Sequence, residues 1–179
     1  MRVVAGACRG RTIVAPDGGD TRPTSDRVRE AIFNALGSLG EVEGAQVVDL
    51  FAGSGALGIE ALSRGADHCT FVERNRGARD VIHQNLQTLG LVARAEVVAN
   101  DVLLYLRDAP AFDLALIDPP YQFGDWDALL LGIDASTAVI ESNRVIEVPA
   151  GWSTVREKRY GGTVVLIARR KVEPDHAPE

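Results

Sequence analysis

The central part of the chain alternates between short apolar runs and longer segments whose apolar residues recur every three or four positions. The short runs resemble buried strands, and the periodic segments have the spacing of amphipathic helices. The pattern predicts strands over residues 46–50, 68–73, 95–99, 112–118 and 137–141. It predicts helices between them over residues 56–64, 75–89, 101–107 and 125–132. Such alternation implies right-handed crossovers and a parallel sheet.

The two ends of the chain follow different patterns. Residues 152–160 and 163–170 are strand-like runs joined by Gly161-Gly162, which predicts an antiparallel hairpin. We therefore predict an α/β, Rossmann-like fold with a mostly parallel seven-stranded sheet and an antiparallel C-terminal hairpin. Residues 2–7 and 11–14 are expected to form two short strands, followed by a helix capped by Thr24 or Ser25. One apolar face of that helix should be buried, through Val28, Ile32, Phe33 and Leu36.

The predicted organisation is a basic β-hairpin arm over residues 1–22, a main domain over 23–172 and a disordered tail over 173–179. A chain of 179 residues is long enough to bury one ordinary core. No apolar run approaches the ~20 residues that span a bilayer, so we expect a cytoplasmic protein with no membrane contact. The cysteines and histidines lack metal-ligand spacing, so reduced thiols and no metal site are expected.

Charge is distributed unevenly along the chain. The net charge of −6 argues against a nucleic-acid partner, but residues 1–30 contain six arginines and only four acidic residues. A basic arm on an acidic body would contact phosphates locally. A solvated basic surface is the alternative interpretation.

A glycine-rich motif, Asp49-Leu-Phe-Ala-Gly-Ser-Gly-Ala-Leu-Gly58, follows the first strand of the main domain. Its G-x-G-x-x-G spacing between a strand and a helix lets a nucleotide-like ligand approach the backbone. Glu73 ends the next strand, where ribose hydroxyls would lie. Asp101 follows the third strand, where it would accept from an adenine amino group, cap a helix, or do both.

The acidic residues distinguish two classes of cofactor. A carboxylate at Asp49 would repel a pyrophosphate, whereas S-adenosyl-L-methionine (SAM) carries an ammonium and a sulfonium and no phosphate. Carboxylates at three successive strand ends therefore favour SAM over a dinucleotide. The candidate cofactor site comprises Asp49, Phe51, Gly53, Gly55, Glu73, Arg74, Asn100, Asp101 and Val102.

A second motif, Asp118-Pro119-Pro120-Tyr121, follows the fourth strand at the crevice where open α/β sheets bind ligands. The exocyclic amine of a base is a weak nucleophile, and a carboxylate and a carbonyl that accept its N–H groups would return electron density to nitrogen. The prolines have no N–H to compete for those acceptors, and Tyr121 offers a face for stacking. These four residues are the catalytic candidates, and a strand-ending turn with a buried tyrosine is the alternative. Phe123 and Trp126 would extend the stacking surface or pack in the core.

An amine on a paired base is reached only by flipping the base or by using an unpaired loop. The candidate RNA-binding residues are Arg9, Arg11, Arg22, Thr24 and Arg27. Arg22 and Arg27 would hold phosphate or the SAM carboxylate, or form a structural salt bridge with Asp26 or Glu30.

Four motifs together make residues 1–171 resemble the RsmD-type small-subunit ribosomal RNA guanine-N2 methyltransferases. They are residues 2–6 with Arg9-Gly-Arg11, Thr21-Arg-Pro-Thr24 with residues 26–34, the glycine-rich loop, and Asp118-Pro-Pro-Tyr121. The resemblance implies a class I SAM-dependent methyltransferase fold and methylation of one guanine N2, at position 966 of 16S rRNA. It also implies an assembled or nearly assembled 30S subunit as substrate; we expect a monomer. A basic or polar residue would be expected where Cys8 stands.

Several rival functions share parts of this pattern. A DNA adenine-N6 or cytosine-N4 methyltransferase uses the same Asp-Pro-Pro-Tyr logic but usually carries a separate recognition domain. A protein glutamine methyltransferase would favour Asn at position 118. A non-catalytic RNA-binding module that keeps SAM as a structural ligand would not need Asp118-Pro-Pro-Tyr121, and a dehydrogenase is disfavoured by Asp49.

Overall fold

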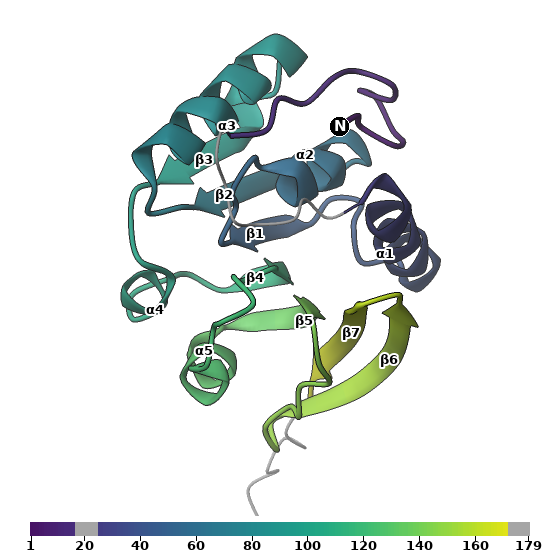
Figure 1. The fold of residues 1–179 in the computed structure, drawn as a ribbon, viewed down its shortest axis with the longest axis vertical. Coiled ribbons are helices and arrows are strands. Elements are labelled where there is room, and N and C mark those ends of the chain that lie inside the picture. The colour runs from purple at the N-terminus through teal and green to yellow at the C-terminus, as the bar shows by residue number, and fades with distance from the viewer. Residues whose placement is uncertain (17–24, 172–179) are drawn as a thin grey trace, which may run out of the picture.

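The computed structural model describes residues 1–16 and 25–171, which are built around one central sheet (Figure 1). The strands are β1 (Gln46–Leu50), β2 (His68–Val72), β3 (Ala95–Val98), β4 (Phe112–Ile117), β5 (Ala135–Ser142), β6 (Trp152–Tyr160) and β7 (Thr163–Arg170). The helices are α1 (Asp26–Leu39), α2 (Ala56–Ser63), α3 (Arg76–Leu89), α4 (Val102–Tyr105) and α5 (Trp126–Gly132), with a 3₁₀ turn η1 at Val92–Arg94.

The described strands form a seven-stranded sheet in the order β3-β2-β1-β4-β5-β7-β6. Strands β1 to β5 pair in parallel, and β7 pairs antiparallel with both β5 and β6. The predicted sheet and C-terminal hairpin are confirmed. The chain order reverses between β1 and β4, and a reversal of this kind opens a ligand crevice at the carboxyl ends of the strands.

Helices cover both faces of the sheet and enclose two apolar cores (Figure 1). One core lies under α1, α2 and α3 and includes Phe33, Ile59 and Ile82. The other lies under α4 and α5 and includes Leu129 and Leu130. None of the helices in the described part of the chain is both long and apolar enough to cross a membrane.

Helix α1 starts as the sequence predicts. The Ser25 side chain accepts a hydrogen bond from Val28 N at 3.2 Å, so Ser25 is the N-cap. The four apolar residues predicted to share one face, Val28, Ile32, Phe33 and Leu36, are all buried. Beside them lies a charged residue that the pattern does not reveal, because Arg29 is fully buried and its Nε lies 3.5 Å from the equally buried Glu60 Oε2 of α2.

The N-terminal arm, residues 1–16, differs from the prediction of two short strands. Its described residues make one isolated antiparallel bridge, between Arg2 and Thr12. Backbone bonds nevertheless join its two ends as a short hairpin, because Val3 N donates to Arg11 O at 3.0 Å and Ile13 N to Met1 O at 2.9 Å. The arm is also held by α2, because Val4 N and Ala5 N donate to Glu60 at 2.8 and 3.0 Å. The two predicted strands are thus reduced to one bridge. The predicted boundaries at residues 22 and 172, and the predicted tail, lie outside the described residues.

Gly6 is required where the arm approaches α2 most closely. It has a φ of 80°, and a Cβ at this position would lie 1.8 Å from the Ser63 carbonyl oxygen. The next residues are bonded to the same helix end, since Ala7 N donates to Ser63 O and Cys8 N to Ser63 Oγ. Both cysteines, Cys8 and Cys69, are buried and unpaired.

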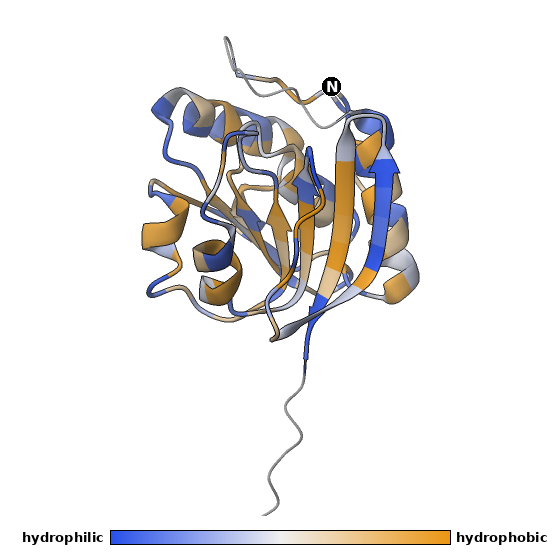
Figure 2. Cartoon of the chain, turned by 60° about the horizontal axis from the view of Figure 1, so that its bottom comes forward, coloured by the Kyte–Doolittle hydropathy of each residue, from blue (hydrophilic) through white to orange (hydrophobic). Residues whose placement is uncertain are grey.

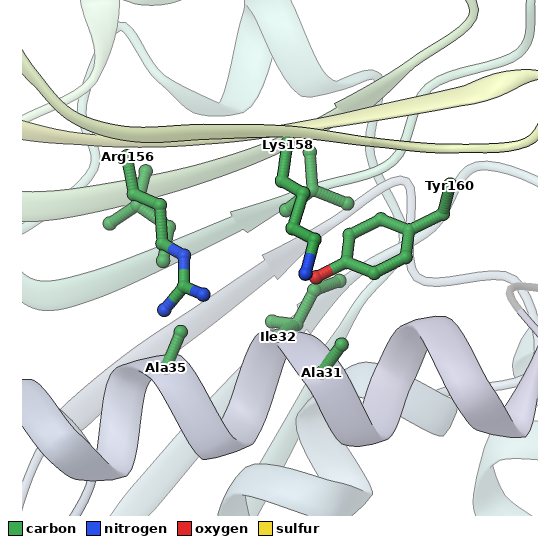
Figure 3. A pocket seen from close by; sticks show the side chains of 8 residues that line it. Ala31, Ile32, Ala35, Arg156, Lys158 and Tyr160 are labelled. Atoms are coloured by element: carbon green, nitrogen blue, oxygen red, sulfur yellow. The ribbon is translucent and has the colours of Figure 1, made fainter.

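Strand β6 is an edge strand and is strongly polar, whereas its neighbour β7 is apolar (Figure 2). Arg156, Lys158 and Tyr160 extend from β6 across a shallow depression toward Ala31 and Ala35 of α1 (Figure 3). Charged side chains on an edge strand oppose pairing with another chain. This depression is lined by α1, β6 and β7 rather than by the loops after β1 and β4.

Candidate functional site

The carboxyl ends of β1, β2 and β4 carry the acidic residues singled out in the sequence. Asp49 lies near the end of β1, Glu73 directly follows β2, and Asp118 directly follows β4. Because β2, β1 and β4 are parallel neighbours, these residues lie together at the carboxyl ends of the strands, on both sides of the point where the strand order reverses. The fold therefore brings the donor and acceptor motifs together.

The glycine-rich loop has a strained backbone. Phe51 has a φ of 62°, an uncommon conformation for a residue with a side chain, and Gly53 and Gly55 have φ values of 56° and 77°. Such strain persists where surrounding contacts fix it, and it clusters at ligand sites. Here Ala52 N donates to Val72 O at 3.1 Å and Gly55 N to Ala52 O at 2.7 Å.

Space beside this loop differs from one glycine to the next. A Cβ on Gly53 would meet nothing closer than 3.9 Å, so the backbone is open to a ligand there. A Cβ on Gly58 would lie 2.4 Å from Phe71 Cε1 and 2.6 Å from Cys69 Sγ. The first glycine thus leaves room for a ligand, and the third lets α2 pack on β2.

Asp49 lies beneath the loop and is only 1% exposed. Its Oδ2 accepts a hydrogen bond from Gly58 N at 2.9 Å, which fixes the first turn of α2. Burial raises the pKa of Asp49 well above its usual range, the hydrogen bond from Gly58 opposes that shift, and the charges of Asp118 and Glu73 add to it. A cationic ligand at this edge would lower that pKa again. The contact of Asp49 with the SAM ammonium, direct or through water, stays a prediction.

Glu73 joins the loop to the next helix. Its Oε2 accepts from Gly53 N at 3.0 Å and its Oε1 from Asn75 N at 2.7 Å. An ionised carboxylate has about four acceptor positions, so these two bonds leave room for ribose hydroxyls. The ribose role remains a prediction.

The residues after β3 form a helix cap. Asp101 Oδ1 accepts from Leu103 N at 2.9 Å and caps α4, and Asn100 Oδ1 accepts from Asp101 N at 2.9 Å. Arg74 is exposed and Asp101 is half-buried, with Arg74 Nη1 4.0 Å from Asp101 Oδ2. The expected cap is present, and the adenine contact stays a prediction that the cap does not prevent. Val102 is buried below it.

The acceptor turn is more open than the loop. Asp118 is half-buried, Pro119 is buried, and Tyr121 is 48% exposed. The alternative of a strand-ending turn around a buried tyrosine is therefore wrong. Pro120 O accepts from Phe123 N at 2.8 Å, which closes the turn.

Aromatic rings connect the two motifs. The rings of Phe51 and Phe123 are 5.2 Å apart and edge to face, and the same is true of Phe123 and Trp126. Such pairs contribute about 0.5–1.5 kcal/mol beyond their buried area. Phe51 from the glycine-rich loop therefore contacts the segment that follows the acceptor turn.

The basic candidates lie in different places. Arg11 donates to the carbonyls of Thr88 and Leu89 at the end of α3. Helix α3 has 14 residues and a length of about 21 Å at ~1.5 Å per residue. It runs back from the carboxyl end of β2, so its own end lies near the amino ends of the strands. Arg9, near Arg11 in the arm, and Arg27 on α1 are exposed. Arg22 and Thr24 lie outside the described residues.

Reasoning from the sequence did not identify two features of this region. Asn85 is 1% exposed; its side chain accepts from Val14 N at 2.9 Å and donates to Val14 O and Ser54 O, each at 3.0 Å. It thereby ties the arm to the glycine-rich loop, and its place on the apolar face of α3 was an available signal. A salt bridge with Asp26, one alternative considered for Arg27, is formed by Arg29, whose Nη2 lies 2.9 Å from Asp26 Oδ1.

Known proteins resemble this chain over nearly its whole length. The family described as Conserved hypothetical protein 95 matches residues 1–169. The ribosomal RNA small subunit methyltransferase D of Escherichia coli (strain K12) is 35% identical, over 97% of this chain and 91% of that protein. YlbH of Bacillus subtilis (strain 168) is 40% identical, over 96% of this chain and 100% of its own length.

The chain belongs to the RsmD/YlbH family. The solved structure of YhhF from Escherichia coli has a TM-score of 0.85 at 34% identity, over 97% of this chain and 99% of that one. A Pyrococcus horikoshii structure with 20% identity has a TM-score of 0.75 and shares the fold over 89% of this chain and 94% of that one. Membership of the RsmD/YlbH family and these neighbours establish the class I SAM-dependent methyltransferase fold.

Proposed function

We propose that this protein transfers a methyl group from SAM to the exocyclic N2 of one guanine in small-subunit ribosomal RNA, at position 966 of 16S rRNA. The observation that carries the proposal is the Asp118-Pro-Pro-Tyr121 turn with its half-exposed tyrosine, which lies beside a strained glycine-rich loop across the reversal of strand order. The name of the E. coli relative supports the ribosomal substrate.

The donor side fits a cationic nucleoside. Gly53 leaves the loop open, and Asp49, Glu73 and Asp101 offer acceptors to the ammonium, the ribose hydroxyls and the adenine amine. Phe51, Gly55, Arg74, Asn100 and Val102 complete the proposed cofactor site. When bound, SAM supplies a sulfonium-activated methyl group that needs no further activation by the protein.

The acceptor side aligns the base. Asp118 and a backbone carbonyl of the turn accept the two N–H groups of the amine, which keeps the nitrogen lone pair directed at the methyl carbon. Pro119 and Pro120 present no competing N–H. Tyr121, which is half exposed, stacks on the ring. Placing donor and acceptor in near-attack geometry is the main contribution of the protein to the rate.

We infer that the substrate is the assembled or nearly assembled 30S subunit, modified in the cytoplasm by a monomer. Arg9, Arg22, Thr24 and Arg27 would contact RNA phosphates, while Arg11 would do so in addition to its bonds to α3. These contacts are salt-dependent, because each releases counterions from the RNA.

The test is to incubate the protein with methyl-labelled SAM and 30S subunits from a strain that lacks the orthologous enzyme. Free 16S rRNA and duplex DNA are the parallel acceptors, and digestion with mass spectrometry locates the label. Label on one guanine N2 of 30S is expected. Label on DNA alone would reject the ribosomal substrate, and bound SAM without label on any acceptor would favour the binding-module alternative.

A further inference from the structure

The shallow depression between α1 and β6 lies outside the proposed SAM and guanine sites. We call it the basic seam; Ala31 and Ala35 border it on α1, and Arg156, Lys158 and Tyr160 border it on β6 (Figure 3). Both of its charged residues are cations, and the proposed function assigns no role to either. The protein as a whole is acidic, with a formal net charge of −6, so a basic surface requires a local explanation.

The two faces of β6 carry different charge patterns. The β7 residues that pair with Arg156 and Lys158 pack in the core under α1, so both cations stand on the face that α1 borders. The alternate positions, Glu157 and Arg159, stand on the other face and carry opposite charges. Charge that only protects an edge strand from pairing has no need of one sign. The uniform positive charge of the α1 face therefore indicates an anionic partner.

The cations of the basic seam are exposed, and neither Arg156 nor Lys158 forms an ion pair with any described residue. Arg169, on the same face of β7, differs in this respect, because its Nε donates to Glu41 Oε1 at 2.9 Å. Lys158 instead holds its Nζ 5.3 Å from the centre of the Tyr160 ring. A cation–π contact positions an ammonium group and leaves N–H donors available. Both cations are therefore free to bind a ligand.

The basic seam reaches the level of the acceptor turn. Asp118 directly follows the β4 residue that pairs with Ile140, so it is level with Glu141 of β5. Glu141 pairs with Val165 of β7, and Val165 pairs with Lys158 of β6. Three strand spacings of about 4.8 Å therefore separate Asp118 from Lys158, about 14 Å along the sheet. A few nucleotides of an extended RNA strand span that distance, so RNA whose target base lies at the acceptor turn can reach the seam.

Helix α1 continues the seam toward the same end of the sheet. Arg27 is exposed and precedes Ala31 by four residues, so it lies one turn away on the same stripe of the helix. Ala31 itself lies at the Tyr160 end of the seam (Figure 3). Arg156 and Lys158 are two residues apart on an antiparallel strand, a spacing of about 7 Å. That spacing is on the scale of successive phosphates in RNA, and Arg27 extends the row of cations beyond β6.

We propose that the basic seam binds the phosphate backbone of the RNA strand that flanks the target guanine, through Arg156 and Lys158 in line with Arg27. This inference rests on the proposed function and adds a contact surface separate from the N-terminal arm, which docks on α2. Contacts to phosphate fix the position of a nucleic acid and carry no sequence information. The seam therefore holds the strand in place, and the acceptor turn binds the base.

The experiment measures binding to 30S subunits from a strain that lacks the orthologous enzyme, across a salt series. The double variant Arg156→Gln, Lys158→Gln should bind roughly tenfold or more weakly, because two charge-assisted bonds are lost. The slope of log K against log salt should become shallower by about 1.4, which is about 0.7 for each lost phosphate contact. SAM affinity should stay the same. Arg107→Gln, Lys171→Gln is the matched control, because it removes two charges at exposed positions outside the seam; it should retain the wild-type slope.

A conservative double variant, Arg156→Lys with Lys158→Arg, keeps both charges and should keep the wild-type slope. A wild-type slope in the glutamine variant, with or without new self-association through β6, would overturn the inference, and so would an equal change in the control. Weaker binding to 30S with unchanged binding to free 16S rRNA would assign the seam to a ribosomal protein and overturn the inference as well. Each of these results leaves the proposed function intact if the wild-type protein methylates guanine in 30S. Absence of that methylation would overturn the proposed function, and this inference with it.

Discussion

The two halves of the proposed site are built differently. On the donor side, Asp49, Glu73 and Asn85 each bond to the glycine-rich loop or to the helix that it starts, and two of them are almost fully buried. On the acceptor side, Tyr121 is half exposed, and the hydrogen bond from Phe123 N closes the turn. A small ligand with a constant shape suits the rigid half, and a macromolecular substrate would complete the open half.

The largest expected effect separates the halves by function. Asp118→Ala should lower turnover by roughly 10²-fold or more, because it removes an acceptor for the reacting amine, and should leave SAM affinity nearly unchanged. Single-turnover kinetics and calorimetric titration with SAM measure the two quantities. Asp125→Ala is the control, because Asp125 is exposed in the same segment and makes no capping bond. Near-normal turnover of the Asp118 variant would remove this residue from the chemistry.

A second test introduces a steric clash on the donor side. Gly58→Ala places a Cβ within 2.6 Å of both Phe71 and Cys69, so the free energy of unfolding should fall by about 1–3 kcal/mol. SAM binding should weaken as well, since α2 and its loop must shift. Gly37→Ala in α1 is the control, because no atom lies within 4 Å of its added Cβ, and it should stabilise the helix by about 1 kcal/mol. Urea denaturation measures both changes. Equal free energies of unfolding for wild type and Gly58→Ala would mean that the packing around Gly58 can accommodate a methyl group.

Asp49→Asn tests the buried charge on the donor side. Because burial raises the pKa of Asp49, the folded protein retains a proton that the unfolded chain releases. Stability from this group therefore falls as pH rises from the usual carboxyl range through the raised pKa. The variant should flatten that fall, gain stability at neutral pH and bind SAM roughly tenfold more weakly, the effect of one lost charge-assisted bond.

Denaturation between pH 5 and pH 8, paired with SAM titration, checks this prediction. Asp67→Asn, at an exposed position, is the control for a lost charge. A steeper fall of stability with pH in the Asp49 variant would contradict the assigned sign.

The smallest effect concerns the arm. Arg9→Ala should leave stability unchanged and reduce the salt dependence of RNA binding by about 0.7 in the slope of log K against log salt. Arg11→Ala should also lower stability, because Arg11 bonds to the carbonyls at the end of α3. Binding to 30S across a salt series and thermal denaturation separate the two; identical slopes for wild type and Arg9→Ala would place Arg9 outside the interface.

The sequence pattern predicted correctly those structural elements that depend on residues close together in the chain. Strand β1 and the hairpin β6–β7 match the predicted ranges, since alternation and glycine turns are local signals. The cap of α1 at Ser25 and the end of α3 before Gly90 follow from the same kind of chemistry.

Contacts between distant residues escaped that reasoning. The bonds from Val4 and Ala5 to Glu60 join residues more than fifty positions apart, and they dock the arm on α2. Buried Arg29 and Asn85 occupy positions where composition favours exposure.

The docking of the arm on Glu60 has a consequence for how the protein opens. Because a fully buried carboxylate accepts from Val4 N and Ala5 N, releasing the arm would leave Glu60 without two of its donors. Those two amide protons should therefore exchange with solvent through the same rare opening as the core of α2, not through fraying of a chain end. Residues 1–16 would then form one cooperative unit with α2, on which they dock.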